Sequence, residues 1–272
     1  MRDLLRHPTG LAGAVLLALI AVMTIFGPLI APYDPQQFHP LSRLQGPSVA
    51  YWLGTDQFGR DILSRILNGA RSTILFGLGA TMAGVAAGGA IGLIAGAIGG
   101  AVDSLIMRLL DGLLAVPDLL FTLLIVTVLG GGSGHAMLAV AIAFMPGLAR
   151  IARSTVLSVR TREFVLAAQA RGESPVYVIA CEIMPNTIAP IIVEATIRVS
   201  FAIMLGATLG FLGLGAQPPS TEWGLMIAEA RQYMFRNPIC VAAPGVAIAL
   251  AALGFNLLGD ALRDLTDPRG RR

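Results

Sequence analysis

Six apolar segments of about membrane length alternate along the chain with shorter polar segments. A helix needs about 20 apolar residues to cross the hydrocarbon core of a bilayer. Hydropathy places such segments at residues 11–32, 72–98, 112–130, 136–150, 187–213 and 239–259. Lipid offers the backbone no hydrogen-bonding partner, so a chain with this pattern crosses it as helices. The sequence therefore predicts an all-α polytopic membrane protein with six transmembrane helices in a single membrane domain, residues 1–272.

Composition excludes several kinds of site. Hydrophobic residues make up 55% of the 272 residues and charged residues only 13%, which leaves no room for a soluble catalytic domain. All 19 basic residues are arginine, so a lysine-containing phosphate loop and Schiff-base chemistry are excluded. His7, His39 and His135 are isolated from one another, and Cys181 and Cys240 fall near opposite membrane faces. Neither a metal site nor an internal disulfide is predicted.

The arginines indicate the orientation. If the N-terminus is cytoplasmic, the inner segments hold 12 arginines, the outer segments hold 6, and one lies inside a span. Arginine is enriched on the cytoplasmic side of membrane proteins, so both termini are predicted to be cytoplasmic. Residues 33–71 and 214–238 then face the other side. The first apolar segment is too long for the core of a secretory signal, so we expect it to be an uncleaved anchor.

A long, part-polar cytoplasmic segment, residues 151–186, separates the fourth span from the fifth. Good helix formers precede Gly172, which offers a left-handed stop, and a second short helix can run from Pro175 until Pro185 ends it. Two short helices joined at a glycine can lie flat under the membrane and present one face to a soluble partner. An interfacial amphipathic hairpin without a partner is the alternative.

This segment resembles the EAA loop of permease subunits in ATP-binding-cassette (ABC) importers, through AAQARG at 167–172 and MPN at 184–186. Four further stretches are similar to the C-type permease of the dipeptide/oligopeptide/nickel family: WLGTDQFGRDILSRILNGARSTI at 52–74, DSLIMRLLDGLLAVPDLL at 103–120, FLGLGAQPPSTEWGLMIAEAR at 211–231 and NLLGDALRDLTDPR at 256–269. The resemblance covers nearly the whole chain. We call residues 151–186 the coupling segment. Within it, the positions that match the family are Glu163, Ala167, Ala168, Gly172, Pro185 and Asn186.

The resemblance implies a type I ABC importer transmembrane domain whose EAA loop docks into a cleft on an ATPase subunit. It implies four kinds of partner: a second, B-type permease that shares the translocation path, two ATP-binding subunits, an extracytoplasmic substrate-binding protein, and the lipid of a bacterial inner membrane. No nucleic acid is expected. ATP and magnesium would be bound by the ATPases, so this chain would hold no cofactor or metal and catalyse nothing.

The cargo stays open at this point. Dipeptides or oligopeptides are commonest in the family that the chain resembles, but nickel, glutathione or another small solute are carried by near relatives. A secondary transporter that works without a motor is the alternative from another class. The chain lacks the inverted second half that is typical of such transporters.

Four positions depart from the family pattern. Leu166 occupies the position of the EAA glutamate, and Cys181 and Glu182 replace the usual basic pair, which implies a specialised ATPase surface. Gly206 replaces an acidic residue that often precedes the FLGLG stretch.

Within the spans, a glycine recurs at every fourth position of the second, which predicts a packing seam for a closely approaching helix; these are Gly84, Gly88, Gly92, Gly96 and Gly100. We expect the second permease to lie against this seam. Glu194 and Arg198 are four residues apart in the fifth span, where they can neutralise each other or contact substrate.

On the outer side, the apolar pattern predicts an amphipathic helix from Arg60 to Arg71 that lies on the membrane surface. Its charged side chains, Arg60, Asp61 and Arg65, would point away from the apolar face. Residues 54–61 and 216–236 are the segments that we expect to receive the binding protein.

Overall fold

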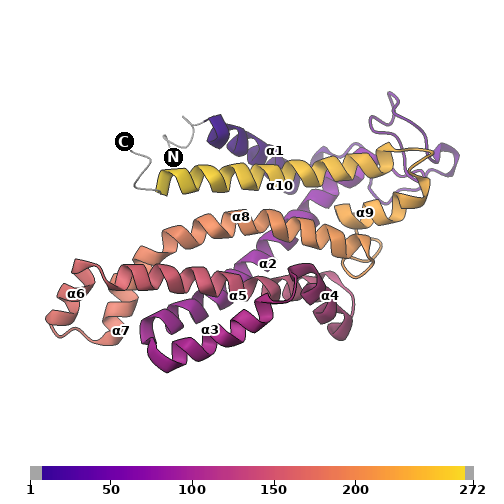
Figure 1. The fold of residues 1–272 in the computed structure, drawn as a ribbon. Helices are drawn as coiled ribbons and strands as arrows, with labels where there is room; N and C mark the ends of the chain where they lie inside the picture. The colour runs from indigo at the N-terminus through magenta and orange to yellow at the C-terminus, as the bar shows by residue number, and fades with distance from the viewer. Residues whose placement is uncertain (1–7, 267–272) are drawn as a thin grey trace.

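The computed structural model describes residues 8–266, which form a bundle of long helices (Figure 1). Five helices are long and apolar enough to span a membrane: α1 (Pro8–Ile30), α2 (Ile62–Ile98), α5 (Ser133–Arg160), the continuous helix Pro175–Phe211 that contains α8 (Met184–Phe211), and α10 (Ile239–Thr266). A sixth is the pair α3 (Gly100–Leu114) and α4 (Asp118–Leu129), which is bent by 90°. No strand occurs in these described residues, so the prediction of an all-α polytopic fold is confirmed.

The short elements gather at the two ends of the bundle (Figure 1). At one end lie α6 (Glu163–Ala170) and α7 (Pro175–Tyr177), together with the first turn of α1 and the last turn of α10. At the other end lie α9 (Trp223–Ala230) and the irregular residues 31–61. The segments predicted to share a membrane side therefore lie at the same end of the bundle. Five of the arginines behind that prediction lie outside the described residues: Arg2, Arg6, Arg269, Arg271 and Arg272.

The predicted surface helix at residues 60–71 is wrong. Asp61 caps the N-terminus of α2, where its Oδ2 accepts a hydrogen bond from the Ser64 backbone N–H at 2.7 Å, and the helix then runs unbroken to Ile98. The apolar residues that we assigned to a membrane surface instead pack inward, with Ile62 and Ile66 in the core beside Trp223. The indole Nε1 of Trp223 donates to the Ile66 carbonyl at 3.0 Å.

Two other boundaries differ because prolines act differently in different places. Pro146 lies inside α5, which continues to Arg160, so residues 151–160 belong to that helix and not to the predicted loop. Membrane bundles tolerate an internal proline because neighbouring helices satisfy the freed backbone groups. Pro117, in contrast, separates α3 from α4, since it lacks an N–H and restricts the residue before it. The predicted span 112–130 is therefore the end of α3 and the whole of α4.

Candidate functional site

The coupling segment is anchored to the bundle by one face of α6. Val165 and Ala168 are fully buried and pack in a cluster with Val156 and Val159 at the end of α5. The opposite face is open: Ala167 and Glu163 are exposed, and Glu163 lies in the first turn, where its negative charge suits the helix N-terminus. The two neighbouring alanines therefore have different surroundings, one inside the fold and one on the surface.

Gly172 makes the predicted left-handed turn, with φ +81°. Its N–H donates to the Gln169 carbonyl at 3.0 Å, and the Glu173 N–H donates to the Ala168 carbonyl at 3.3 Å, which together form a Schellman motif. No heavy atom lies within 4 Å of the place that a Cβ would occupy at this glycine. The glycine is therefore required for backbone conformation and not for space.

The prediction that Pro185 ends the second short helix is wrong. Ser174 caps the helix, and its Oγ accepts from the Tyr177 N–H at 3.2 Å. A π-helical stretch, η3 (Val178–Ile183), then leads directly into α8. In η3 the Met184 N–H donates to Ile179, five residues back, and this wider turn relieves the clash that a proline makes in a regular helix.

Asn186 completes this junction. Its Nδ2 donates to the Glu182 backbone carbonyl at 2.7 Å, next to the position where the proline has no N–H. Pro185 and Asn186 thus lie where the coupling segment becomes a transmembrane helix. The sequence signal for this arrangement was present, because Pro at the first turn of a helix is compatible with helix on its C-terminal side.

The glycine seam packs within the chain. Gly84, Gly88, Gly92 and Gly96 are buried against α5, and a Cβ built at Gly92 would lie 2.2 Å from the Ala149 carbonyl oxygen. The helix that approaches closely is therefore this chain's own α5, which corrects our expectation that the second permease lies against the seam.

Gly100 does not belong to the seam. It begins α3 with φ +66°, and no heavy atom lies within 4 Å of its missing Cβ. With Gly99, at φ +71°, it turns the chain from α2 into α3. The fourfold spacing extended past the end of the helix, so periodicity alone assigned this glycine to the wrong feature.

Charged side chains pair between and within the spans. Arg198 Nε donates to Glu194 Oε1 at 2.9 Å, as the i, i+4 spacing predicted, and the guanidinium carbon of Arg198 lies 5.2 Å from the centre of the Phe144 ring in α5. Two further pairs were missed because this helix was predicted to end at residue 150, whereas α5 continues to Arg160. Arg153 donates to the Asp103 carboxylate of α3 through Nε and Nη2. Arg150 pairs with Asp111, also of α3. These contacts hold α3 beside α5.

At the end of the bundle that holds α9, a buried ion network holds residues 54–65 against that helix. Arg60 and Arg65 both contact the Asp56 carboxylate at 2.6 Å and the Glu229 carboxylate at 2.8 and 3.0 Å. The side chains of both arginines are 5% exposed or less. The charges balance, so each desolvated ion has a partner. Arg60 and Arg65 were predicted to point away from the apolar face of a surface helix, and the structure buries both of them instead.

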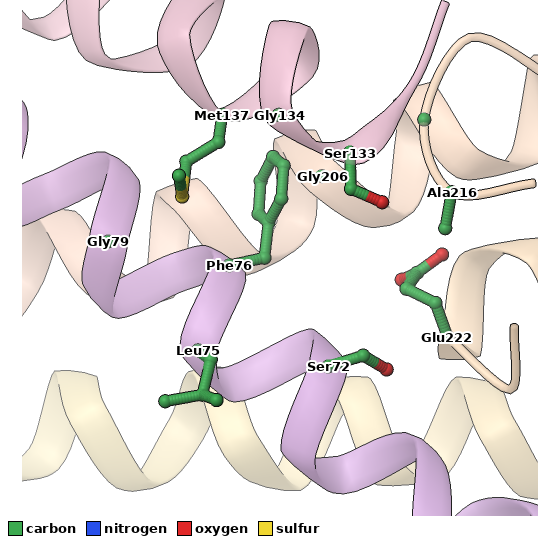
Figure 2. A pocket seen from close by; sticks show the side chains of 11 residues that line it. Ser72, Leu75, Phe76, Gly79, Ser133, Gly134, Met137, Gly206, Ala216 and Glu222 are labelled. Carbon is green, nitrogen blue, oxygen red and sulfur yellow. The ribbon is translucent and has the colours of Figure 1, made fainter.

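A cavity of about 480 Å³ opens between α2, α5 and α8 near the same end (Figure 2). Its walls are mainly apolar, and Glu222 points toward it. Both carboxylate oxygens of Glu222 accept backbone hydrogen bonds at 2.9 Å, from Gly224 and Leu225, and so cap α9. Burial raises the pKa of Glu222 above its ordinary value of 4.5, although the two hydrogen bonds oppose that shift.

Gly206 lines the same cavity, where its missing side chain is replaced by the ring of Phe76. A Cβ at this position would lie 2.3 Å from the Phe76 Cε1 atom. An acidic residue at position 206 would collide with the ring as it is placed here, which gives the departure from the family pattern a structural reason. The carboxylate in this cavity comes from Glu222 instead (Figure 2).

The segment 216–236, predicted to receive the binding protein, is divided. Glu222 and Trp223 are buried, whereas Phe235 is 93% exposed. Within residues 8–266, no group of three or more histidine, cysteine, aspartate or glutamate side chains could hold a metal ion.

Comparison with known proteins places the chain in a family. Residues 88–272 match the family model of the binding-protein-dependent transport system inner membrane component, and residues 1–47 match that of the N-terminal TM domain of oligopeptide transport permease C. Over 75% of its length the chain superposes on 97% of a chain of the MetNI methionine ABC transporter in an inward-facing conformation, with a TM-score of 0.62 and 16% identity, which shows a shared fold.

Full-length relatives agree with these matches. The dipeptide transport system permease protein DppC of Alkalihalophilus pseudofirmus is 42% identical over 98% of this chain and 88% of that protein. The glutathione transport system permease protein GsiD of Escherichia coli O157:H7 is 42% identical over 97% of this chain and 88% of that protein. The chain therefore belongs to the inner membrane components of binding-protein-dependent ABC importers and is a non-catalytic permease subunit of the C type.

Proposed function

We propose that this chain is the C-type permease of an ATP-driven peptide importer in a bacterial inner membrane, with both termini in the cytoplasm. It pairs with a B-type permease, and the translocation path runs between the two. A binding protein delivers substrate to the outer end formed by residues 31–61 and α9. Two ATPase subunits bind ATP and magnesium. The coupling segment of each permease docks onto one of them, in this chain through residues 161–186.

The observation that carries the coupling role is the continuity of the chain from Ser174 to Phe211. A docked α6 connects through the Gly172 turn to a helix that runs without a break through η3 into α8. A displacement imposed on the segment from below is therefore transmitted directly to a transmembrane helix. A hairpin that only rested on the membrane would need no such continuity. The exposed face of α6, with Glu163 and Ala167, is available to a partner, whereas Val165 and Ala168 are committed to the bundle.

The cargo assignment rests on relatives. Dipeptide permeases from two bacteria, DppC of Alkalihalophilus pseudofirmus and the probable DdpC of Escherichia coli K12, are each 42% identical to this chain. Glutathione is the second candidate, because GsiD is 42% identical as well. Both cargoes are short peptides, so they share an ammonium group, at least one carboxylate and amide bonds.

The coupling role is tested by substitution at the turn. Gly172→Val should abolish substrate-stimulated ATP hydrolysis and dipeptide uptake in proteoliposomes that contain all the subunits. The reason is that the left-handed backbone conformation costs a β-branched residue about 1–2 kcal/mol. Gly172→Asn is the matched control, since asparagine tolerates this conformation, and it should keep most of both activities. Wild-type stimulation and uptake in a correctly inserted Gly172→Val protein would show that the segment is not the coupling element.

A further inference from the structure

Two ion pairs on three neighbouring helices expose charge at the depth of the membrane. The side chains of Arg150 and Asp111 are 56% and 55% exposed, and those of Arg198 and Glu194 are 22% and 24% exposed. Arg198 lies midway along the 28 residues of α8, about 20 Å from either end at 1.5 Å per residue. Arg150 lies ten residues before the end of α5, about 15 Å inside it.

Two other helices, α1 and α4, expose mainly apolar side chains along their length. Along α1 these are Leu11, Val15, Leu19, Val22, Ile25 and Leu29, and along α4 they are Leu120, Leu124 and Val128. Such surfaces suit lipid. Lipid disfavours a charged side chain at the helix centre, and ionisable residues in spans accordingly face a bundle interior or water. The contrast indicates that the α3, α5 and α8 side of the molecule is not covered by lipid.

The exposed groups follow one face of α5. Gly147, Arg150, Ser154 and Ser158 are spaced by three, four and four residues, which places them on one side of a helix. Arg150, Ser154 and Ser158 are exposed there, and we call these four residues the polar strip. In the outer half of α5, Ala136 and Val140 on the same side are fully buried, in a cluster with Val126 of α4. The strip is therefore open only in the half of α5 that leads to the coupling segment.

Neighbouring helices border the strip on both sides (Figure 1). On one side lies α8, whose Arg198 guanidinium is 3.0 Å from the Cβ position of Gly147. On the other lies α3, held by the Arg150 pair with Asp111. These two ion pairs contribute two guanidinium groups and two carboxylates to the border.

We propose that the polar strip lines the cytoplasmic half of the translocation path, and that the path accepts solutes that carry both charges. This inference rests on the proposed importer function and assigns the path to particular residues. The ammonium and carboxylate ends of a zwitterionic peptide can each lie beside an opposite charge on the border. A metal cation is repelled by the two guanidinium groups as much as it is attracted by the two carboxylates, so the border does not favour it. Serine hydroxyls offer donors and acceptors to the peptide group without holding it tightly.

The test is the reactivity of an introduced cysteine in the complete complex. Ser154→Cys is made in a background that carries Cys181→Ser and Cys240→Ala, and Val15→Cys on α1 is the control. Ser154 lies six residues from the end of α5 and Val15 seven residues from the start of α1, so each is about 10 Å from the same end of the bundle. Inverted membrane vesicles expose this end to a charged methanethiosulfonate reagent.

We expect the cysteine at 154 to react at least tenfold faster than that at 15, and its modification to block uptake. Equal rates would overturn the proposal, because lipid or the second permease would then cover the strip. A cationic and an anionic reagent, each normalised to its rate with a free thiol, should react at 154 within threefold of each other, and a tenfold preference would refute the balanced border. Labelling requires no knowledge of the cargo, so a complex that labels as expected but takes up no dipeptide would refute only the peptide assignment.

Discussion

Replacing Gly92 with alanine should separate the two central helices. The added Cβ would lie 2.2 Å from the Ala149 carbonyl oxygen and 2.7 Å from the Ala152 Cβ. Real Cβ contacts are essentially never shorter than 3.0 Å, so α2 and α5 must part by about 0.8 Å, the difference between 3.0 and 2.2. Neither neighbour can rotate away, because one is backbone and the other is a Cβ.

The energetic cost follows from that displacement. A gap of this size removes a quarter to a half of each dispersion contact, or about 0.05 kcal/mol per atom pair, and on the order of 50 pairs across the adjoining turns give about 2.5 kcal/mol. Alanine recovers about 1 kcal/mol through its higher helix propensity than glycine. The net destabilisation is about 1.5 kcal/mol, which corresponds to about 3–6 °C in Tm for a chain of this size.

The matched control is Gly89→Ala in the same helix. No heavy atom lies within 4 Å of the Cβ position at Gly89, so this variant should keep or slightly raise the Tm. The assay is thermal unfolding of the detergent-purified chain, followed by the loss of monodisperse protein. If the two variants differ by less than about 1 °C in Tm, the close approach of α2 and α5 is not as described. Gly92→Leu should prevent the chain from folding, and not merely from pairing with the second permease.

Three further outcomes can be measured. Glu163→Lys should weaken ATPase binding in pull-downs without changing the Tm, since the side chain is exposed, and an acidic substitution on the ATPase should restore binding; unchanged binding would remove α6 from the docking surface. Arg65→Met should destabilise the chain by about 3–5 kcal/mol, because it leaves the buried Asp56 carboxylate with one guanidinium less; a loss below about 1 kcal/mol in denaturant titration would show that the network is hydrated. The pKa of Glu222 is raised in the folded state, so the folded protein binds this proton more tightly than the unfolded chain does, and the Tm should fall as pH rises from 4.5 through the folded pKa. Glu222→Gln should flatten that part of the plot of Tm against pH. Parallel plots for the variant and the wild type would contradict the assignment.

Much of the fold could be predicted, because long apolar runs in the sequence identify membrane helices. Features that depend on local spacing could be predicted from the sequence. These are most of the spans, the Gly172 turn, the Glu194–Arg198 pair and four of the seam glycines. The first source of error is that burial is a tertiary property. Arg60 and Arg65 look like surface charges until Asp56 and the distant Glu229 neutralise them.

Prolines were the second source of error, for a related reason. Pro117, Pro146 and Pro185 each remove one backbone donor, and only their surroundings decide whether the helix breaks. At Pro117 the chain turns by 90°; at Pro146 the buried helix continues; at Pro185 a π-turn absorbs the defect. No local rule separates these cases, because the deciding contacts come from other helices.

The length of α8 has a consequence for the proposed coupling. Its 28 residues measure about 42 Å at 1.5 Å per residue, longer than the roughly 30 Å hydrocarbon thickness of a bilayer. A rod of that length that tilts by about 10° around its midpoint moves each end by about 4 Å in opposite directions. One end follows the coupling segment, and the other carries Gly210, against which the Glu222 carboxylate and α9 are packed. Under the proposed coupling, a push on the first end would therefore displace α9 in the opposite direction without a relay of side chains.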